Sequence, residues 1–251
     1  MKLSILIVAK DAQTVIEKTL KSLDKMGDEI LVLDNESRDN TGEIAEAYGA
    51  KVFRKTGQSL GHLKNYLIKR AKNDWILLLD SDETLSQGLR EEIEEVFNQG
   101  NTQFVGYRIP YQNHVFGKPV YYGGEAYSKI RLFSRKSGYI QSYSLHEDTI
   151  VKGEVGKLKN VINHYSYRNL LQLFKKFTSY AWLMSKLKAL KKERISLSKI
   201  FLYGPHMFWA RYIKDKGYLD GWQGFILAFA FAYMEQMTYF FLLYRGFRGK
   251  S

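Results

Sequence analysis

The 251-residue sequence contains no cysteine, only three prolines and no glycine-rich phosphate-binding loop. Without cysteine, disulfides, thiolate catalysis and cysteine-based zinc sites are excluded, and the composition fits a reducing compartment. The turn after the first apolar run reads VAKDAQT, and it has no glycine that would admit a pyrophosphate. The dinucleotide-binding fingerprint is therefore absent, and the missing GxxxxGK[ST] sequence excludes a P-loop nucleotidase.

Positive charge and aromatic side chains are concentrated in the last hundred residues. The net charge is +12, but residues 1–150 carry 20 lysines and arginines against 21 aspartates and glutamates. Residues 151–251 carry 18 against 5, and residues 199–247 hold 16 of the 37 aromatic side chains. This distribution favours an anionic partner for the C-terminal part, either a membrane surface or a nucleic acid.

Short apolar runs alternate with amphipathic segments in the first half of the chain. Such alternation is typical of an α/β fold with a mostly parallel, Rossmann-like sheet. The first run ends at Lys10 and Asp11, which is too short for a secretory signal, so we expect a buried strand there. The predicted strands cover 3–9, 29–33, 51–54 and 75–79, and the predicted helices cover 13–26, 41–48, 60–71 and 85–97.

The pattern changes beyond residue 100. Segments 104–111 and 129–133 alternate like antiparallel strands, and a further strand is predicted over 151–155. From residue 163 onward the chain is expected to continue mainly as helices. One helical stretch covers 196–213, with a break predicted at Gly204-Pro205, and an apolar segment covers 222–244.

Polar side chains follow three of the predicted strands at the sheet edge where α/β proteins bind ligands. Asp11 follows the first strand, Asp34 and Asn35 the second, and Asp80 and Asp82 the fourth, in the sequence DWILLLDSDE. Carboxylates are preferred ligands of hard divalent cations, and such cations accompany phosphate-bearing substrates. The sequence therefore predicts a metal and phosphate site at this edge.

Three further sites are less specific. Lys64 begins a predicted helix near the same edge, where it either reaches a phosphate or is a solvated helix lysine. Glu83 either supports the acidic cluster or caps the next helix. The sequence LHED, which contains His146, Glu147 and Asp148, forms a second cluster of ionisable side chains.

Six segments together resemble glycosyltransferase family 2, and most closely the bacterial lipopolysaccharide core β-glucosyltransferases. They are LSILIVAKDAQTVIEKTLKSL, LVLDNESRDNT, GHLKNYLIKRAKNDWILLLDSDE, LHED, NHYSY and GYLDGWQGFILAF. The resemblance implies the nucleotide-diphospho-sugar transferase fold, with a catalytic domain over 1–165 and a basic, aromatic helical region over 166–251. Within the catalytic domain, 1–100 would be the donor-binding half and 101–165 the acceptor half.

The resemblance also implies an activity. The chain would be an inverting, metal-dependent hexosyltransferase that moves a sugar from a nucleotide diphosphate donor, with UDP-glucose as the first guess. The acceptor would be the lipopolysaccharide core or another cell-envelope glycan, met at an anionic membrane surface. The expected location is cytoplasmic and peripheral, at the inner face of the cell membrane.

Site roles follow from the matching positions. The donor nucleotide would be held by Ala9, Asp11, Asp34, Asn35, Lys64 and Asp80. Asp82 would bind Mg²⁺ or Mn²⁺, with Asp80 and His164 as further candidate ligands, although His164 also fits a structural role. Glu147 would be the general base, with Asp148 as the alternative. Many members carry a second aspartate where Asn35 stands, so this position does not determine which nucleobase is recognised.

The apolar segment 222–244 is long enough to span a bilayer, at about 1.5 Å per residue. Glu235 and Gln236 interrupt it, and an ionisable group at mid-membrane costs about 2.5–3.5 kcal/mol. An interfacial helix fits better, with flanking basic residues at Lys214, Lys216, Arg245, Arg248 and Lys250. Packing on the catalytic domain or on a second subunit is the third option.

Two other function classes would require features that differ from those observed. A nucleotidyltransferase with a similar sheet should have a basic, glycine-rich first loop, which this sequence lacks. A nucleic-acid-binding protein would use the basic C-terminal helices and leave the carboxylates at the sheet edge without a role. We therefore expect no nucleic-acid partner.

Overall fold

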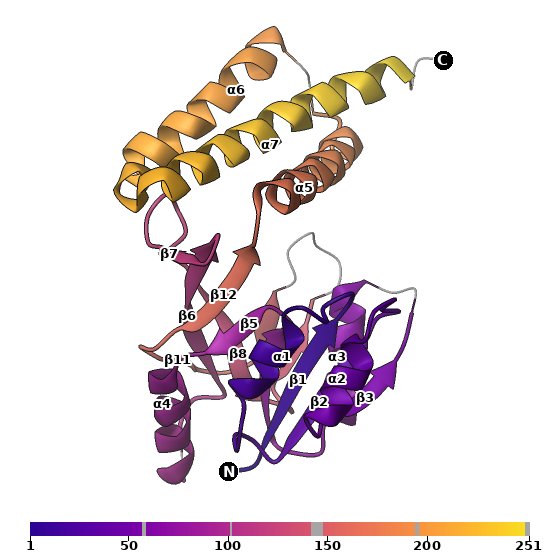
Figure 1. Cartoon of the computed structure of the whole chain (residues 1–251), viewed down its shortest axis with the longest axis vertical. Helices are drawn as coiled ribbons and strands as arrows, with labels where there is room; N and C mark the ends of the chain where they lie inside the picture. The colour runs from indigo at the N-terminus through magenta and orange to yellow at the C-terminus, as the bar shows by residue number, and fades with distance from the viewer. Residues whose placement is uncertain (57–58, 101, 142–147, 194–195, 249–251) are drawn as a thin grey trace. The chain divides into compact units, whose positions relative to one another are not determined.

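The computed structural model describes residues 1–56, 59–100, 102–141, 148–193 and 196–248 (Figure 1). The chain divides into two compact units. Unit 1 comprises Met1–Tyr111 and Tyr127–His164, and unit 2 comprises Gln112–Ala126 and Tyr165–Ser251. The segment Gln112–Ala126, which the sequence assigned to the acceptor half, thus belongs with the C-terminal helices.

Unit 1 is a mixed α/β structure built on one large sheet. Its strands run in the order β3-β2-β1-β4-β8-β6-β12-β5, with β11 beside β6. Strands β3, β2, β1 and β4 are parallel, whereas β8 is antiparallel to both β4 and β6. The elements are β1 (Leu3–Ala9), α1 (Ile16–Lys21), β2 (Glu29–Asp34), α2 (Thr41–Ala47), β3 (Lys51–Arg54), α3 (Leu60–Arg70), β4 (Trp75–Asp80), β5 (Glu83–Leu85), α4 (Gln87–Asn98), β6 (Gly106–Val115), β8 (Ser128–Ser134), β9 (Gly138–Ile140), β10 (Thr149–Val151), β11 (Val155–Lys157) and β12 (Ile162–Tyr167).

The first strand is buried on both faces, as its continuous apolar sequence predicted. Because side chains alternate along a strand, Ile5 and Ile7 pack toward α1, α2 and α4, while Leu6 and Val8 pack toward α3. The α/β fold and its parallel first half are therefore confirmed. Two apolar layers, one on each face of the sheet, hold the carboxyl ends of β1, β2 and β4 in a common plane.

The first helix is shorter than the predicted segment 13–26. Helix α1 ends at Lys21, and turns follow until β2 begins at Glu29. Lys25 and Gly27 have φ values of +57° and +79°, which no helix accommodates. The chain needs these left-handed residues to reverse direction into β2.

The strand predicted over 151–155 was wrong. Val151 ends β10, and Val155 begins β11, which pairs with β6 instead. Gly153 lies between them with a φ of +134°, so the backbone turns sharply there. The segment predicted as one strand therefore contributes its two ends to short strands in different sheets.

Unit 2 is helical, and α7 packs against both α5 and α6 (Figure 1). Its elements are β7 (Lys118–Val120), α5 (Leu170–Leu190), α6 (Leu197–Trp209), a π-helical turn (Ala210–Lys214), a 3₁₀ turn (Gly217–Asp220) and α7 (Gly221–Arg248). Among the described residues, Gly217–Gly246 is long and apolar enough to cross a membrane by length and composition. Its mean hydropathy is 1.4, and 39% of its most apolar window is buried within the structure.

The break predicted at Gly204-Pro205 was also wrong, since α6 runs through both residues. A proline removes one backbone hydrogen bond, yet packing maintains the helix. Gly204 is buried against α7, where a Cβ atom would lie 2.6 Å from Gln236 Oε1. The glycine therefore permits close approach of α6 to α7, and the irregularity appears later as the π-helical turn.

Candidate active site

The carboxyl ends of three parallel strands meet at one edge of the unit 1 sheet. Ala9 is paired in register with Asp34 of β2, and Val8 is paired with Asp80 of β4. The structure thus brings together Ala9, Asp34 and Asp80, which the sequence placed at the ends of separate strands. A ligand lying across this edge reaches all three.

Two loops that follow these strands are tied to each other by hydrogen bonds. The Asp11 backbone N–H donates to Ser37 Oγ at 2.9 Å, and the Arg38 N–H donates to Asp11 Oδ1 at 2.8 Å. Asp34 is buried, and its Oδ1 accepts from the Ser37 N–H at 2.9 Å. The Asn35 N–H donates to the Ala9 carbonyl at 2.8 Å. The predicted nucleotide-binding loops are therefore preorganised around one edge.

Asp80 is held between two cations. Lys64 Nζ lies 2.9 Å from its Oδ1, and Arg131 Nη2 lies 2.7 Å from its Oδ2. Burial alone raises the pKa of Asp80, but the charges of Arg131 and Lys64 outweigh it and hold that pKa well below its ordinary value. Lys64 is buried, so it is not the solvated helix lysine that the sequence allowed.

Glu83 is a buried member of the same network and is 1% exposed. Its Oε1 accepts from Arg131 Nη2 at 2.9 Å, and its Oε2 accepts from the Asp80 backbone N–H at 2.9 Å. Burial raises the pKa of Glu83 to about 7, the charge of Arg131 opposes this shift, and the Asp80 carboxylate adds to it. The cap of α4 is Ser86, whose side chain accepts from the Leu89 N–H. Glu83 therefore supports the acidic cluster and does not cap the helix.

Two stacked tyrosines lie beside this network. Arg131 Nε donates to the Tyr111 hydroxyl, and burial raises the pKa of Tyr111 well above its ordinary value. The rings of Tyr111 and Tyr127 stack with centroids 4.9 Å apart, and Lys129 Nζ lies 5.5 Å from the Tyr127 centroid. Burial and the nearby charge of Arg131 lower the pKa of Lys129.

Asp82 and His164 form a separate pair. Residue His164 of β12 is paired in register with Glu83 of β5, so its ring lies next to the turn that carries Asp82. His164 Nε2 is 3.7 Å from Asp82 Oδ1, and both side chains are partly exposed. The structure therefore brings together two of the predicted metal ligands, whereas both oxygens of the third, Asp80, contact cations.

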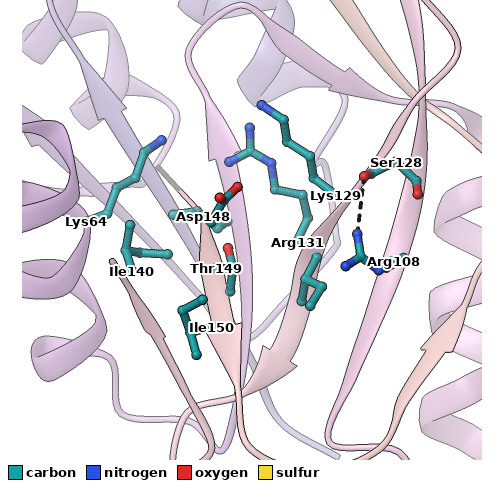
Figure 2. A pocket seen from close by; sticks show the side chains of 11 residues that line it. Lys64, Arg108, Ser128, Lys129, Arg131, Ile140, Asp148, Thr149 and Ile150 are labelled. Carbon is teal, nitrogen blue, oxygen red and sulfur yellow. Dashed lines mark hydrogen bonds between the residues drawn. The ribbon is translucent and has the colours of Figure 1, made fainter. Parts of the chain in front are cut away.

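A pocket of about 290 Å³ opens on the α3 side of the sheet. Figure 2 shows Lys64, Lys129 and Arg131 directing their cationic ends toward the same region, with Asp148 between Lys64 and Arg131. Leu78 and three isoleucines supply its apolar lining, and Arg108 lies at its side. Of the two candidates for the general base, Asp148 lines this pocket. The other candidate, Glu147, and its neighbour His146 lie outside the described residues.

Could these residues hold a metal? In the described part of the chain, no group of three or more His, Asp or Glu side chains is arranged to bind a metal ion. Asp82 and His164 are near enough to share a cation and expose the oxygen and nitrogen donors that Mg²⁺ or Mn²⁺ accepts. These two side chains could supply two ligands of a divalent cation, which would need its remaining ligands from elsewhere.

The sequence did not identify Arg131, Tyr111 or Lys129 as site residues. Arg131 lies in KIRLF, and an arginine in a strand flanked by buried apolar residues is a signal for a buried ion pair. Its partners, however, are 48 and 51 residues away along the chain. Their proximity follows from the antiparallel pairing of β8 with β4.

Similarity to known proteins bears on both family and fold. Residues 4–151 match the family described as Glycosyl transferase family 2. An uncharacterized glycosyltransferase of Rickettsia bellii is 30% identical over 252 residues, covering 92% of this chain and 83% of that protein. One of Rickettsia typhi is 29% identical over 253 residues with the same coverage. The crystal structure of S. aureus TarS 1-349 in complex with UDP-GlcNAc is similar in fold, with a TM-score of 0.50 at 13% identity. The similarity covers 100% of this chain and 93% of that chain. It confirms the expected nucleotide-diphospho-sugar transferase fold.

Proposed function

The chain belongs to glycosyl transferase family 2, and we propose that it transfers a sugar from a nucleoside diphosphate donor to a cell-envelope glycan with inversion at the anomeric carbon. The observation that carries the proposal is the convergence of Ala9, Asp34 and Asp80 on one sheet edge, next to Asp82 and His164. Open α/β sheets bind ligands at this edge.

The donor half of the site suits a uridine diphosphate sugar. We assign recognition of the nucleobase to Asp34 and Asn35, and a hydrogen bond from a ribose hydroxyl to Asp80. TarS was crystallised with UDP-GlcNAc, which supports testing uridine donors first. UDP-glucose is our first candidate, on the likeness to lipopolysaccharide core glucosyltransferases.

We assign the metal to Asp82, with His164 as its second protein ligand. A bound Mg²⁺ or Mn²⁺ would neutralise negative charge on the leaving diphosphate. Lys64 and Arg131 keep Asp80 ionised and fixed, so that Asp80 orients the nucleotide without giving up its ion pairs. The cationic lining of the pocket adds positive potential on the same side of the sheet.

The reaction needs a carboxylate on the acceptor side. In an inverting displacement, that carboxylate takes the proton of the acceptor hydroxyl while the oxygen attacks the anomeric carbon and the bond to the diphosphate breaks. We assign this role to Glu147, with Asp148 as the alternative. Asp148 lines the basic pocket together with Lys64 and Arg131.

We further propose that the acceptor is carried by a membrane, with the lipopolysaccharide core as the first candidate. The strong positive charge of unit 2 supports an anionic surface as its partner. The protein would then work at the inner face of the cell membrane, where nucleotide sugars are available.

A panel of nucleotide sugars incubated with Mg²⁺ or Mn²⁺ and an envelope extract tests the proposal. We expect release of UDP and labelling of a glycolipid. If Asp82→Ala and Glu147→Ala both retained wild-type transfer, the assigned site would be wrong. Release of pyrophosphate would instead indicate a nucleotidyltransferase, and tight, salt-dependent duplex binding without transfer would indicate a nucleic-acid-binding protein.

A further inference from the structure

Helix α7 is the inner helix of unit 2. On one side, Leu227 and Ala230 are buried with Leu173 and Phe177 of α5. On the other side, Tyr239 and Leu242 are buried with an isoleucine of α6. Figure 1 shows α7 lying between the other two helices. Part of the apolar surface of α7 is therefore used to form this unit's own core, while other side chains of the helix, such as Phe225 and Phe229, are exposed.

Polar side chains of α7 also bind its neighbours. Gln236 Nε2 donates to the carbonyl of Ile200 in α6. The Tyr239 hydroxyl donates to Glu193 Oε1 at 3.0 Å, and Lys188 Nζ of α5 donates to that hydroxyl at 3.1 Å. A membrane-spanning α7 would give up these bonds and expose the polar groups to lipid, which is strongly unfavourable.

Much of the apolar surface of helix α6 is uncovered. Phe201 is 64% exposed, Leu202 is 61% exposed and Trp209 is 52% exposed. Ile213 continues this surface in the π-helical turn. The sequence FLYGPHMFWA from 201 to 210 contains no aspartate, glutamate, lysine or arginine. We call Phe201, Leu202, Trp209 and Ile213 the α6 face.

Basic residues adjoin the α6 face. Lys214 and Lys216 are exposed directly after Ile213, and neither forms an ion pair within the ranges that the structure describes. The carboxylate of Asp220 is used elsewhere, since it accepts from the backbone N–H groups of Tyr121 and Tyr122. Unit 2 as a whole has 16 lysines and arginines against 5 acidic residues, a net charge of +11, whereas unit 1 has only +1.

Exposed aromatic and aliphatic side chains next to free lysines characterise helices that lie in the headgroup region of an anionic bilayer. We propose that the α6 face inserts into the surface of an anionic membrane, with Lys214 and Lys216 at the lipid phosphates, while α7 stays packed against α5 and α6. This inference deepens the proposed function, because it names the element that brings the enzyme to a membrane-borne acceptor. It also replaces the sequence-based expectation that residues 222–244 are the interfacial helix.

Flotation of the full-length protein with lipid vesicles tests the inference. Vesicles of 30% phosphatidylglycerol in phosphatidylcholine should bind the wild type, and pure phosphatidylcholine should bind it at least tenfold more weakly. Phe201→Ser/Trp209→Ser should reduce binding at least tenfold, and each of Lys214→Gln and Lys216→Gln about fivefold. The matched control is Tyr48→Ser, a similarly exposed aromatic residue in unit 1, which should bind like the wild type.

A second readout does not depend on a destabilising variant. Brominated lipids should quench the tryptophan fluorescence of the wild type, and Trp209→Phe should remove most of that quenching. Unchanged quenching in Trp209→Phe would overturn the inference, as would wild-type protein that fails to bind anionic vesicles.

Two alternatives give different results. If α7 spans the bilayer, bound protein resists extraction by 1 M salt and alkaline carbonate. If a second copy of the chain covers the α6 face, the wild type is a dimer that Phe201→Ser/Trp209→Ser dissociates without changing vesicle binding. Either result contradicts the proposal. Because vesicle binding requires no nucleotide sugar, failure of the proposed transferase reaction leaves this test intact.

Discussion

One nitrogen of Arg131 joins the two carboxylates that flank the β4–β5 turn. Nη2 lies 2.7 Å from Asp80 Oδ2 and 2.9 Å from Glu83 Oε1, and Lys64 contacts the other oxygen of Asp80. The turn between these carboxylates carries Asp82. A buried guanidinium therefore fixes the backbone that presents the candidate metal ligand, although Arg131 itself need not touch a substrate.

Replacing Arg131 with methionine should lower the free energy of unfolding by about 3–5 kcal/mol, because the buried Glu83 and Asp80 lose their shared partner. Arg131→Lys should recover only part of this loss, since an ammonium group cannot bind both carboxylates and the Tyr111 hydroxyl in the same geometry. Urea unfolding followed by circular dichroism measures the difference. Arg135→Met is the control, because among the described residues the Arg135 side chain hydrogen-bonds to the backbone carbonyl of Asn73 and to no carboxylate. Equal effects at positions 131 and 135 would contradict the assigned role.

Asp82→Asn should weaken Mn²⁺ binding in the presence of UDP by tenfold or more, and His164→Gln should weaken it less. The reason is that Asp82 supplies the anionic ligand, whereas His164 supplies a neutral one. Electron paramagnetic resonance of free Mn²⁺ measures the affinity. Asp74→Asn is the matched control. Asp74 is exposed and directly precedes β4, whereas Asp82 follows the other end of that strand. Unchanged Mn²⁺ affinity in Asp82→Asn would show that the metal is held elsewhere.

Glu147→Gln should reduce kcat by about 10²–10⁴ while leaving UDP affinity unchanged, because a general base acts on the acceptor and not on the nucleotide. Asp148→Asn should have a smaller effect. Steady-state kinetics together with calorimetric titration of UDP separates the two quantities. The reverse order of effects would transfer the role of base to Asp148.

Glu193 should make unit 2 sensitive to acid. Burial alone raises its pKa, but hydrogen bonds from Lys199, Lys188 and Tyr239 outweigh it and lower the pKa to about 2. Because this folded-state pKa is depressed from 4.5, the stabilisation is present above pH 4.5 and is lost as the pH falls toward 2. For this partly exposed group we expect a loss of about 2 kcal/mol.

Glu193→Gln should remove that part of the pH dependence. Denaturant titrations at pH 5 and pH 3, monitored through the tryptophans, compare the variant with the wild type. A wild-type pH dependence that persists in Glu193→Gln would mean that other carboxylates are responsible for it.

The sequence by itself determined those strands that follow from the pattern of neighbouring residues. Continuous apolar runs predicted β1 over the residues observed and β2 and β4 to within one residue, because a strand buried on both faces excludes polar side chains. The short strand β3 was also predicted over the residues observed, although its ends are exposed. Once these strands were predicted, the acidic residues at their carboxyl ends could be assigned to one edge of the sheet. The predicted boundaries were wrong after Lys21 and at Gly153. At both places residues with positive φ change the direction of the chain.

Only the tertiary structure decided which charges meet and which apolar surfaces are covered. Arg131 reaches Asp80 because β8 pairs antiparallel with β4, and no local pattern encodes that pairing. Helices α6 and α7 are similarly apolar in sequence, yet packing buries Leu227 and Tyr239 of α7 and leaves the α6 face exposed. Composition records how much apolar surface a chain has, whereas burial depends on contacts between residues that are distant in sequence.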